Sequence, residues 1–190
     1  MTKKEARNLV NKCFANLSAK EKKNFDDRIL SNFIKFVDTN KYKKIGSYFS
    51  LHNEVNTAHL NDYLTKVGIQ IFLPKLPKDK NNKKLNFFKY LNTDKFTKNR
   101  FGILEPSKNM NPLDINELDL ILVPFRAINK NLYRLGFGGG FYDNSLAEIN
   151  SNKCLGLGYE FQILDEFDIE PHDFKLGSLI TPEGYFKNAL

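Results

Sequence analysis

The chain is poor in cysteine and has no long hydrophobic run, and each absence excludes a class of protein. Its 190 residues include 2 cysteines, Cys13 and Cys154, which show neither metal-site spacing nor a disulfide framework. No apolar run approaches the ~20 residues that a membrane-spanning helix needs. The charged residues 3–5 are unlike the start of a secretory signal. We therefore expect a cytoplasmic protein with reduced thiols and no membrane partner.

Two widespread phosphate-binding motifs are also missing. The P-loop ends in Gly-Lys-Ser/Thr, and no such tripeptide occurs in the chain. The dinucleotide motif needs glycine at its first, third and sixth places. Counted from Gly136 or Gly138, the sixth place holds Phe141 or Asp143. A nucleotide site in this chain must therefore be of another kind.

The composition that is present fits a globular protein with a basic surface. Hydrophobic residues make up 41% of the chain and aromatic residues 13%, so a single domain covering residues 1–190 can bury one core. The 29 basic and 22 acidic side chains give a net charge of +7, which attracts anions. Nucleotide phosphates, carboxylated metabolites and nucleic acid all remain possible ligands on charge alone.

Helical patterns alternate with short apolar runs along the chain. Thr2 and Ser18 each precede a glutamate by three residues, which predicts capping boxes at the start of two helices. A third helix is expected from Thr57 to a stop at Gly68. Further expectations are strands at 45–49, 69–74, 119–124, 153–159 and 176–181, an edge strand at 85–90, a helix at 141–149, an exposed loop at 75–84 and a connector at 101–106. This alternation predicts a three-layer α/β/α, Rossmann-like fold with a mostly parallel central sheet.

The most informative segment is residues 133–143, Tyr-Arg-Leu-Gly-Phe-Gly-Gly-Gly-Phe-Tyr-Asp. Its four glycines remove nearly every Cβ from one loop, so the backbone can approach a ligand closely. Arg134 and Asp143 flank the loop, and the combination suits a nucleotide phosphate with its divalent metal. Alternatively, the glycines serve only a tight turn or a close helix–strand crossing.

This segment closely resembles the signature of 5-formyltetrahydrofolate cyclo-ligases, also called 5,10-methenyltetrahydrofolate synthetases. Other blocks that resemble the family follow in the same order at residues 3–7, 53–57, 73–74, 101–106, 119–124, 158–162 and 171–173. The resemblance covers most of the chain and implies the cyclo-ligase version of the Rossmann-like fold. The glycine signature is highly specific. The other blocks are weak one by one, and they support the resemblance because they occur in the same order as in the family.

The resemblance implies an ATP- and Mg²⁺-dependent ring closure. The formyl oxygen of 5-formyltetrahydrofolate takes the γ-phosphate, N10 attacks the activated carbon, and 5,10-methenyltetrahydrofolate, ADP and phosphate result. It implies small-molecule partners, and a polyglutamate tail on the folate is one that the basic loop 75–84 could attract. We expect no nucleic-acid partner, and a monomer or weak homodimer.

The resemblance also assigns roles to residues. Arg134 and Tyr142 are the expected catalytic residues, Phe49, Glu54 and Tyr142 the expected folate contacts, and Asp143 and Asp173 the expected metal ligands. The expected ATP contacts are Lys3, Arg7, Arg134, Leu135, Gly136, Phe137, Gly138, Gly139, Gly140, Phe141 and Tyr142. Without the family, Lys3 and Arg7 are an ordinary basic stripe on one helix face, and Phe49 is a core residue.

Three positions depart from the family pattern. Asn144 follows Asp143 where many relatives have arginine, Phe141 replaces a frequent tyrosine, and Gly177 stands where relatives usually have an acidic residue. These departures keep open a binding protein without turnover. A nucleic-acid-binding protein, suggested by the charge and the interleaved aromatics, is the other alternative, and it predicts steeply salt-dependent binding to polynucleotide.

Overall fold

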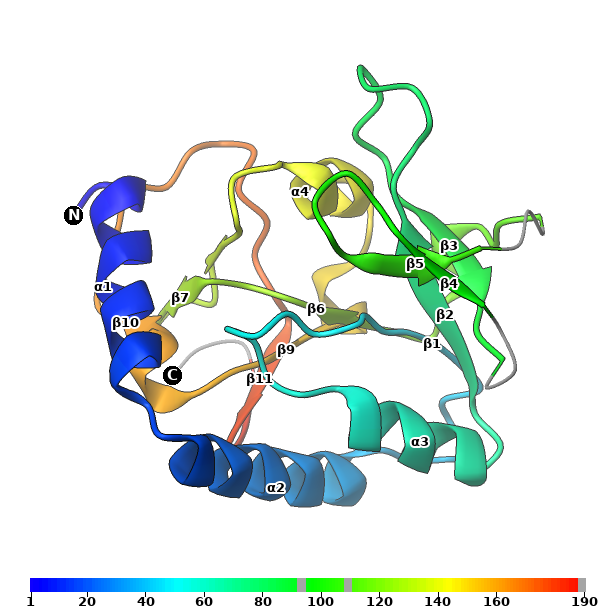
Figure 1. The fold of residues 1–190 in the computed structure, drawn as a ribbon, viewed down its shortest axis with the longest axis horizontal. Helices are drawn as coiled ribbons and strands as arrows, with labels where there is room; N and C mark the ends of the chain where they lie inside the picture. Colours follow the sequence, from blue (N-terminus) through cyan, green and yellow to red (C-terminus); the bar gives the residue numbers. More distant parts are fainter. Residues whose placement is uncertain (92–94, 108–110, 188–190) are drawn as a thin grey trace.

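A seven-stranded sheet crosses the computed structural model, which describes residues 1–91, 95–107 and 111–187 (Figure 1). In spatial order the sheet consists of β12 (Gly184–Lys187), β11 (Ser178–Thr181), β9 (Cys154–Leu157), β6 (Leu120–Val123), β1 (Lys44–Gly46), β2 (Gln70–Lys75) and β3 (Asn86–Lys89). The inner strands pair in parallel, while β12 and β3 close the two edges as antiparallel strands. The predicted mostly parallel sheet is therefore confirmed.

Both faces of the sheet are covered, which explains why β6 is a continuous apolar run. Leu120 and Leu122 point into a core shared with three helices, and Ile121 and Val123 point into a second core on the other face. All four side chains of this strand are buried. A strand between two cores loses the polar alternation of a strand with one wet face.

In the described part of the chain, four α-helices surround the sheet: α1 (Lys3–Asn16), α2 (Ala19–Phe36), α3 (Ala58–Lys66) and α4 (Phe141–Leu146). Helices α2 and α3 lie along one side, and α4 lies on the opposite side (Figure 1). The capping boxes at Thr2 and Ser18 are both formed, and Gly68 follows α3 with a φ of +82°. Helix α4 is shorter than expected because the chain turns at Ile149, whose N–H donates to the Leu146 carbonyl at 2.8 Å. Short 3₁₀ turns occur at η1 (Ile115–Glu117), η2 (Ser151–Lys153) and η3 (Glu160–Gln162).

A small second sheet was not predicted from the sequence. It consists of β10 (Ile163–Leu164), β7 (Ala127–Asn129) and β8 (Arg134–Leu135). Strands of 2 or 3 residues are too short to show a periodic pattern. The β7–β8 hairpin turns through Leu132, a non-glycine residue with a φ of +65°. The glycine loop therefore leaves from this hairpin, not from a strand of the central sheet.

The expectation of a mere connector at residues 101–106 is wrong. Residues 104–106 form β5 (Leu104–Pro106), which pairs in antiparallel fashion with β4 (Phe96–Lys98). The glycine and proline do not prevent this, because Gly102 lies in the turn and Pro106 at the strand end. The buried Glu105 carboxylate anchors the hairpin by accepting hydrogen bonds of 2.8 Å from the Leu76 N–H and the Asn99 amide.

The remaining expectations about elements hold with shifted bounds. The edge strand near residues 85–90 is β3, and residues 76–85 form the loop between β2 and β3 (Figure 1). The Leu85 N–H at the end of this loop donates to Ser145 of α4. The lysines of the loop, at positions 78, 80, 83 and 84, are exposed. Within the described ranges, no helix combines the length and apolar character needed to cross a membrane.

Candidate functional site

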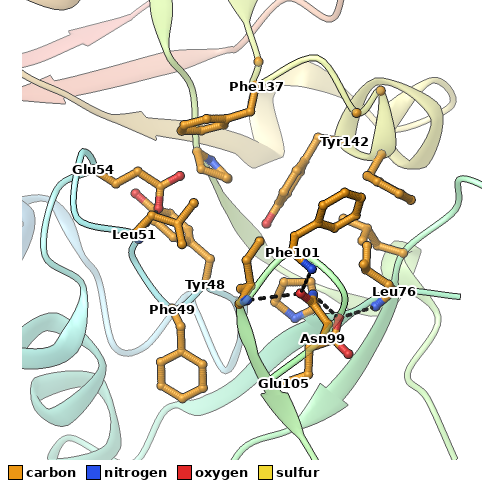
Figure 2. Close-up of a pocket in the computed structure, with 18 of the residues that line it drawn as sticks. Tyr48, Phe49, Leu51, Glu54, Leu76, Asn99, Phe101, Glu105, Phe137 and Tyr142 are labelled. Atoms are coloured by element: carbon orange, nitrogen blue, oxygen red, sulfur yellow. Dashed lines mark hydrogen bonds between the residues drawn. The ribbon is translucent and has the colours of Figure 1, made fainter. Parts of the chain in front are cut away.

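A cavity of about 290 Å³ opens where the chain leaves the carboxyl ends of β1, β2 and β6 (Figure 2). This is the edge at which α/β sheets bind ligands. Its walls come from the segment after β1, the end of β2 and its following loop, the β4–β5 hairpin, the glycine loop (residues 136–140) and the first turn of α4. Predicted site residues in its lining are Phe49, Glu54, Arg134, Gly136, Phe137, Gly139, Gly140, Phe141, Tyr142 and Asp143.

Five predicted site residues do not line the cavity. Leu135 is a core residue that is 2% exposed. Arg7 lies behind the glycine loop, and its Nε donates to the Gly136 carbonyl at 2.9 Å. Gly138 is at the tip of the loop, near the Arg7 guanidinium. The last two, Lys3 and Asp173, pair with each other elsewhere.

The glycine loop requires its glycines for its own conformation. Gly138 and Gly140 have φ values of +101° and +70°, which other residues rarely adopt. At Gly136 a Cβ would lie 2.9 Å from the Arg134 guanidinium. Within the described chain, the backbone N–H groups of residues 137–140 have no hydrogen-bond acceptor. The turn and the ligand interpretations of the glycines are therefore compatible, because the same shape leaves several N–H groups free.

Arg134 is buried beneath this loop. Its side chain is 3% exposed, Nη1 donates to the Pro124 carbonyl at 3.1 Å, and Nη2 pairs with Asp143 Oδ1 at 2.9 Å. The Nε atom is buried and has no hydrogen-bond partner within the described ranges. Arg134 therefore fixes the carboxylate of Asp143 and holds a positive charge in the wall of the cavity.

Tyr142 presents the second unpaired buried group. Its ring packs under the Arg134 guanidinium at 5.6 Å, and its hydroxyl has no hydrogen-bond partner among the residues that the structure describes. In Figure 2 the hydroxyl points into the cavity. Burial, with the negative charge of Glu54 as a smaller cause, raises the pKa of this phenol well above its usual range. The hydroxyl is therefore a proton-bearing donor at neutral pH.

Glu54 lies at the other end of the cavity, in a turn after β1 at residues 51–54 (the Glu54 turn). It is 6% exposed, and its Oε2 accepts a hydrogen bond of 2.6 Å from the Leu51 N–H. Burial raises the pKa of the carboxyl from 4.5 to about 7, while that hydrogen bond and the charge of Arg126 act in the opposite direction. Near neutral pH this carboxyl can accept hydrogen bonds from a ligand or, when protonated, donate one.

Asp173 belongs to a separate cluster near the start of α1. Its Oδ2 pairs with Lys3 Nζ at 2.7 Å and accepts from the Glu170 N–H at 2.7 Å. Lys3 also pairs with the Glu170 carboxylate. Possible metal-ligand atoms of Glu170, His172 and Asp173 lie within 4.8 Å of one another. This group does not include Asp143, so the two predicted metal ligands are not brought together in one cluster.

Aromatic residues form the apolar wall. Phe49 packs edge-on against Phe96 of the β4–β5 hairpin at 4.8 Å, so it is both a core and a cavity residue. Phe101, at the tip of the hairpin, faces Phe141 at 6.1 Å. Phe101 is 57% exposed and was not among the predicted site residues, because nothing in its local sequence indicates that the hairpin reaches the glycine loop.

Arg126 is the other functional candidate that sequence reasoning missed. It is 8% exposed, and its Nη1 donates to the Asn53 carbonyl at 3.1 Å beside Glu54. A single arginine between two apolar runs does not predict that its side chain is buried. The only sequence signal is that it interrupts the otherwise apolar stretch at residues 120–128.

Two of the departures from the family pattern, Asn144 and Gly177, have structural explanations. The Asn144 amide donates to the Gly140 carbonyl at 2.8 Å and so closes the glycine loop. At Gly177 a Cβ would lie 2.3 Å from the Ser151 carbonyl oxygen and 2.7 Å from Asn152 Cα. Because both obstacles are backbone, only glycine fits at position 177 without displacing the chain.

Comparisons with known proteins agree with the geometry. Residues 1–182 match the model of the 5-formyltetrahydrofolate cyclo-ligase family. A Haemophilus influenzae protein named 5-formyltetrahydrofolate cyclo-ligase is 31% identical over 183 residues, which cover 94% of this chain and 97% of that protein. An Escherichia coli K12 protein of the same name is 30% identical over 142 residues, 73% of this chain and 77% of that protein.

Two solved structures are similar in fold along nearly the whole chain. A 5,10-methenyltetrahydrofolate synthetase from Mycoplasma pneumoniae has a TM-score of 0.76 and 26% identity, covering 96% of this chain and 99% of that one. The Aquifex aeolicus 5,10-methenyltetrahydrofolate synthetase has a TM-score of 0.84 and 26% identity, with coverages of 98% and 93%. The family resemblance and the predicted fold class are thereby confirmed.

Proposed function

This chain belongs to the 5-formyltetrahydrofolate cyclo-ligase family of enzymes, and we propose that it converts 5-formyltetrahydrofolate to 5,10-methenyltetrahydrofolate using ATP and Mg²⁺. The formyl oxygen takes the γ-phosphate, leaving ADP. N10 then attacks the activated carbon, and phosphate departs with the former formyl oxygen. The observation that carries the proposal is that Glu54 and the glycine loop line one cavity.

The glycine-loop end is suited to the phosphates. Free N–H groups at residues 137–140 can donate to phosphate oxygens, as backbone nests do. Arg134 adds a buried positive charge with an unpaired Nε, and Arg7 holds the loop from behind. Phosphoryl transfer depends mainly on positioning and charge stabilisation, which these groups supply. Lys3 is too engaged with Glu170 and Asp173 to bind phosphate without leaving them.

Tyr142 stands between the two ends. Its unpaired hydroxyl keeps its proton at neutral pH, so it can donate a hydrogen bond to the formyl oxygen and orient it toward the phosphate. Such a donor also stabilises the negative charge that develops on that oxygen later, when the C–O bond breaks and the oxygen leaves with the phosphate. We therefore assign Tyr142 an orienting role without proton abstraction.

The Glu54 end is suited to the reduced pterin. A buried carboxylate can accept hydrogen bonds from ring N–H groups. Phe49 and Phe101 offer apolar contact on the remaining wall. A cavity with an apolar lining and a few convergent polar groups is the usual form of a small-molecule site.

For Mg²⁺, Asp143 is the better candidate of the two predicted ligands. It lines the cavity, and its Oδ2 has no hydrogen bond to any described residue. Asp173 lies outside the lining, and its carboxylate is taken by Lys3 and the Glu170 N–H. When bound, Mg²⁺ would neutralise phosphate charge. Asp143 can hold it while Arg134 fixes the orientation of the carboxylate.

The test is direct. Purified protein is mixed with ATP, Mg²⁺ and 5-formyltetrahydrofolate, and the methenyl product is followed by its near-ultraviolet absorbance. We expect product only when ATP and the metal are both present. Arg134→Ala should lose most turnover while remaining folded. Folate and nucleotide binding without product would instead indicate a binding protein, and tight salt-dependent polynucleotide binding would favour the nucleic-acid alternative.

The same proposal covers the organisation of the protein. Residues 1–190 would act as one cyclo-ligase domain in the cytoplasm, as a monomer or weak homodimer. Its partners would be ATP and 5-formyltetrahydrofolate, with or without a polyglutamate tail. The exposed lysines of loop 76–85 support an electrostatic attraction for such a tail. Equal catalytic efficiency on mono- and polyglutamylated substrate at low salt would contradict that preference.

A further inference from the structure

Arg126 lies beside the cavity at the point where the chain passes from β6 to β7. Its backbone is fixed, because its N–H donates to the Leu135 carbonyl at 2.7 Å and its carbonyl accepts from the Gln162 amide at 3.0 Å. Its side chain is 8% exposed although it carries a full charge. Charged side chains are seldom buried this far without a specific set of partners.

The partners of the guanidinium come from three different segments. Nη1 donates to the Asn53 carbonyl in the Glu54 turn at 3.1 Å, and Nη2 donates to the Asn11 side chain of α1. The guanidinium carbon also lies 5.1 Å from the ring centroid of Phe137 in the glycine loop. One planar group thus contacts both ends of the cavity and the helix behind them.

The Phe137 contact is the link to the phosphate end. Phe137 is 45% exposed and lines the cavity, so the guanidinium holds one face of a ring that is otherwise open to solvent and ligand. In Figure 2, Phe137 and Glu54 lie on the same side of the cavity. A cation over an aromatic face is attractive, and a guanidinium can make this contact while its N–H groups bond elsewhere in the plane.

The charge of Arg126 also acts on Glu54 at the folate end. It lowers the pKa of the Glu54 carboxyl, in opposition to burial. Other charged or titratable groups that act on or face this carboxyl are Lys22 of α2, Tyr48 after β1 and Tyr142 of α4. Lys22 acts in the same direction, but it also pairs with Asp26, whereas Arg126 has no acidic hydrogen-bond partner among the described residues.

We propose that Arg126 is a positioning residue that couples the glycine loop to the Glu54 turn, so that nucleotide and folate bind more tightly together than alone. The proposal rests on the function proposed above. A ligand that orders the loop fixes Phe137 and with it the guanidinium. The second ligand then meets a Glu54 turn that is already held in place, which lowers the ordering cost of its binding.

The experiment measures this coupling by calorimetry. The dissociation constant of 5-formyltetrahydrofolate is determined with and without a saturating, non-hydrolysable ATP analogue plus Mg²⁺. For the wild type we expect the analogue to tighten folate binding by about 5-fold or more. In Arg126→Met we expect a ratio near one and folate binding weakened by about 10-fold. Arg28→Met is the matched control, because Arg28 carries the same charge but pairs with Glu183 on the surface.

Two further variants separate positioning from simple loss of charge or stability. Arg126→Lys keeps a charge near Glu54 but loses the planar fork, so folate affinity should be largely kept while the coupling is lost. Phe137→Leu keeps every hydrogen bond of Arg126 and should also abolish the coupling. These two variants carry the test if Arg126→Met does not fold, which thermal melting reveals.

The pH dependence gives an independent readout. Removal of the Arg126 charge should move the fall in folate affinity at acidic pH to a higher pH, because Glu54 then holds its proton more tightly.

The outcomes distinguish the inference from the proposed function. If the wild type binds both ligands and turns over, but Arg126→Met keeps the wild-type coupling, the inference is overturned and the function stands. A wild type that binds both ligands independently overturns the inference as well. If the wild type binds no folate, the proposed function and the inference fail together.

Discussion

Tyr142 offers the sharpest test at the residue scale, because its hydroxyl is buried and unpaired. Tyr142→Phe removes the donor without leaving another group unsatisfied. We expect kcat to fall by about 10- to 100-fold while the melting temperature stays the same or rises. Steady-state kinetics and a thermal melt on the same preparation give both values. An unchanged kcat would remove the hydroxyl from the mechanism.

Glu54 should make stability depend on pH. Burial raises the pKa of its carboxyl from 4.5 to about 7, so the folded state binds the proton more tightly than the unfolded state. The free energy of unfolding therefore falls as the pH rises from 4.5 through 7, by an amount on the order of 3 kcal/mol. Glu54→Gln lacks this loss and keeps an acceptor for the Leu51 N–H.

The measurement is the melting temperature of Glu54→Gln minus that of the wild type. This difference should increase between pH 5 and pH 8, because the wild type loses stability over this range and the variant does not. A chain of this size changes its melting temperature by roughly 2–4 °C per kcal/mol. The same variant should bind folate more weakly at pH 8. A difference that is constant across this range would show that the carboxyl has an ordinary pKa.

Site residues that lie close together in the sequence could be predicted, whereas those that come from distant segments could not. Arg134, Tyr142 and Asp143 lie within ten positions of one another, so one motif predicts that they share a site, and they do lie together. Arg126 and Phe101 reach the site through long-range folding of hairpins that no local pattern announces. Asp173 was expected at the metal, but it pairs with Lys3. The sequence does not predict this pair, because it does not reveal where helix α1 docks.

At the scale of elements, one face of α1 organises the surroundings of the cavity. Lys3, Arg7 and Asn11 are spaced by four residues and so form a stripe along the helix. Lys3 pairs with Asp173, Arg7 donates to the Gly136 carbonyl, and Asn11 accepts from Arg126. From the sequence alone this stripe would be interpreted as solvated. In the structure its residues contact three different loops.

Loss of the middle contact should affect nucleotide binding first. Arg7→Gln removes the charge and loosens the glycine loop at Gly136, so we expect the KM for ATP to rise by about 10-fold, with a smaller change for folate. Lys4→Gln is the matched control, because Lys4 is exposed on the same helix and loses the same charge. Equal effects of the two substitutions would indicate a general electrostatic effect.

The elements themselves were predictable where the pattern is long. Capping boxes and the 14- and 18-residue helices α1 and α2 are strong local signals. The continuous apolar run of β6 predicted a strand buried on both faces. By contrast, the strands of the small sheet and the β4–β5 hairpin owe their pairing to partners elsewhere, and their 2 or 3 residues carry no period.

At the scale of the whole molecule, Gly177 marks a close crossing of two backbone segments. Gly177→Ala should lower the free energy of unfolding by about 2–4 kcal/mol, because its Cβ meets backbone that cannot rotate away. Gly68→Ala is the comparison: its surroundings are open, and only its φ of +82° resists the substitution. That cost is about 1 kcal/mol. Denaturant unfolding of both variants measures the difference, and equal losses would contradict the crossing.

The residues at the start of α1 are held by a segment that lies far along the sequence. The Met1 carbonyl accepts from the Asp168 N–H at 3.0 Å, and Lys3 reaches Asp173 across 170 positions. The start of α1 therefore depends on a segment far along the chain, whereas the contacts of Arg7 and Asn11 do not involve that segment. Loss of the Lys3–Asp173 pair should loosen the first turn of α1 and leave the support behind the glycine loop in place.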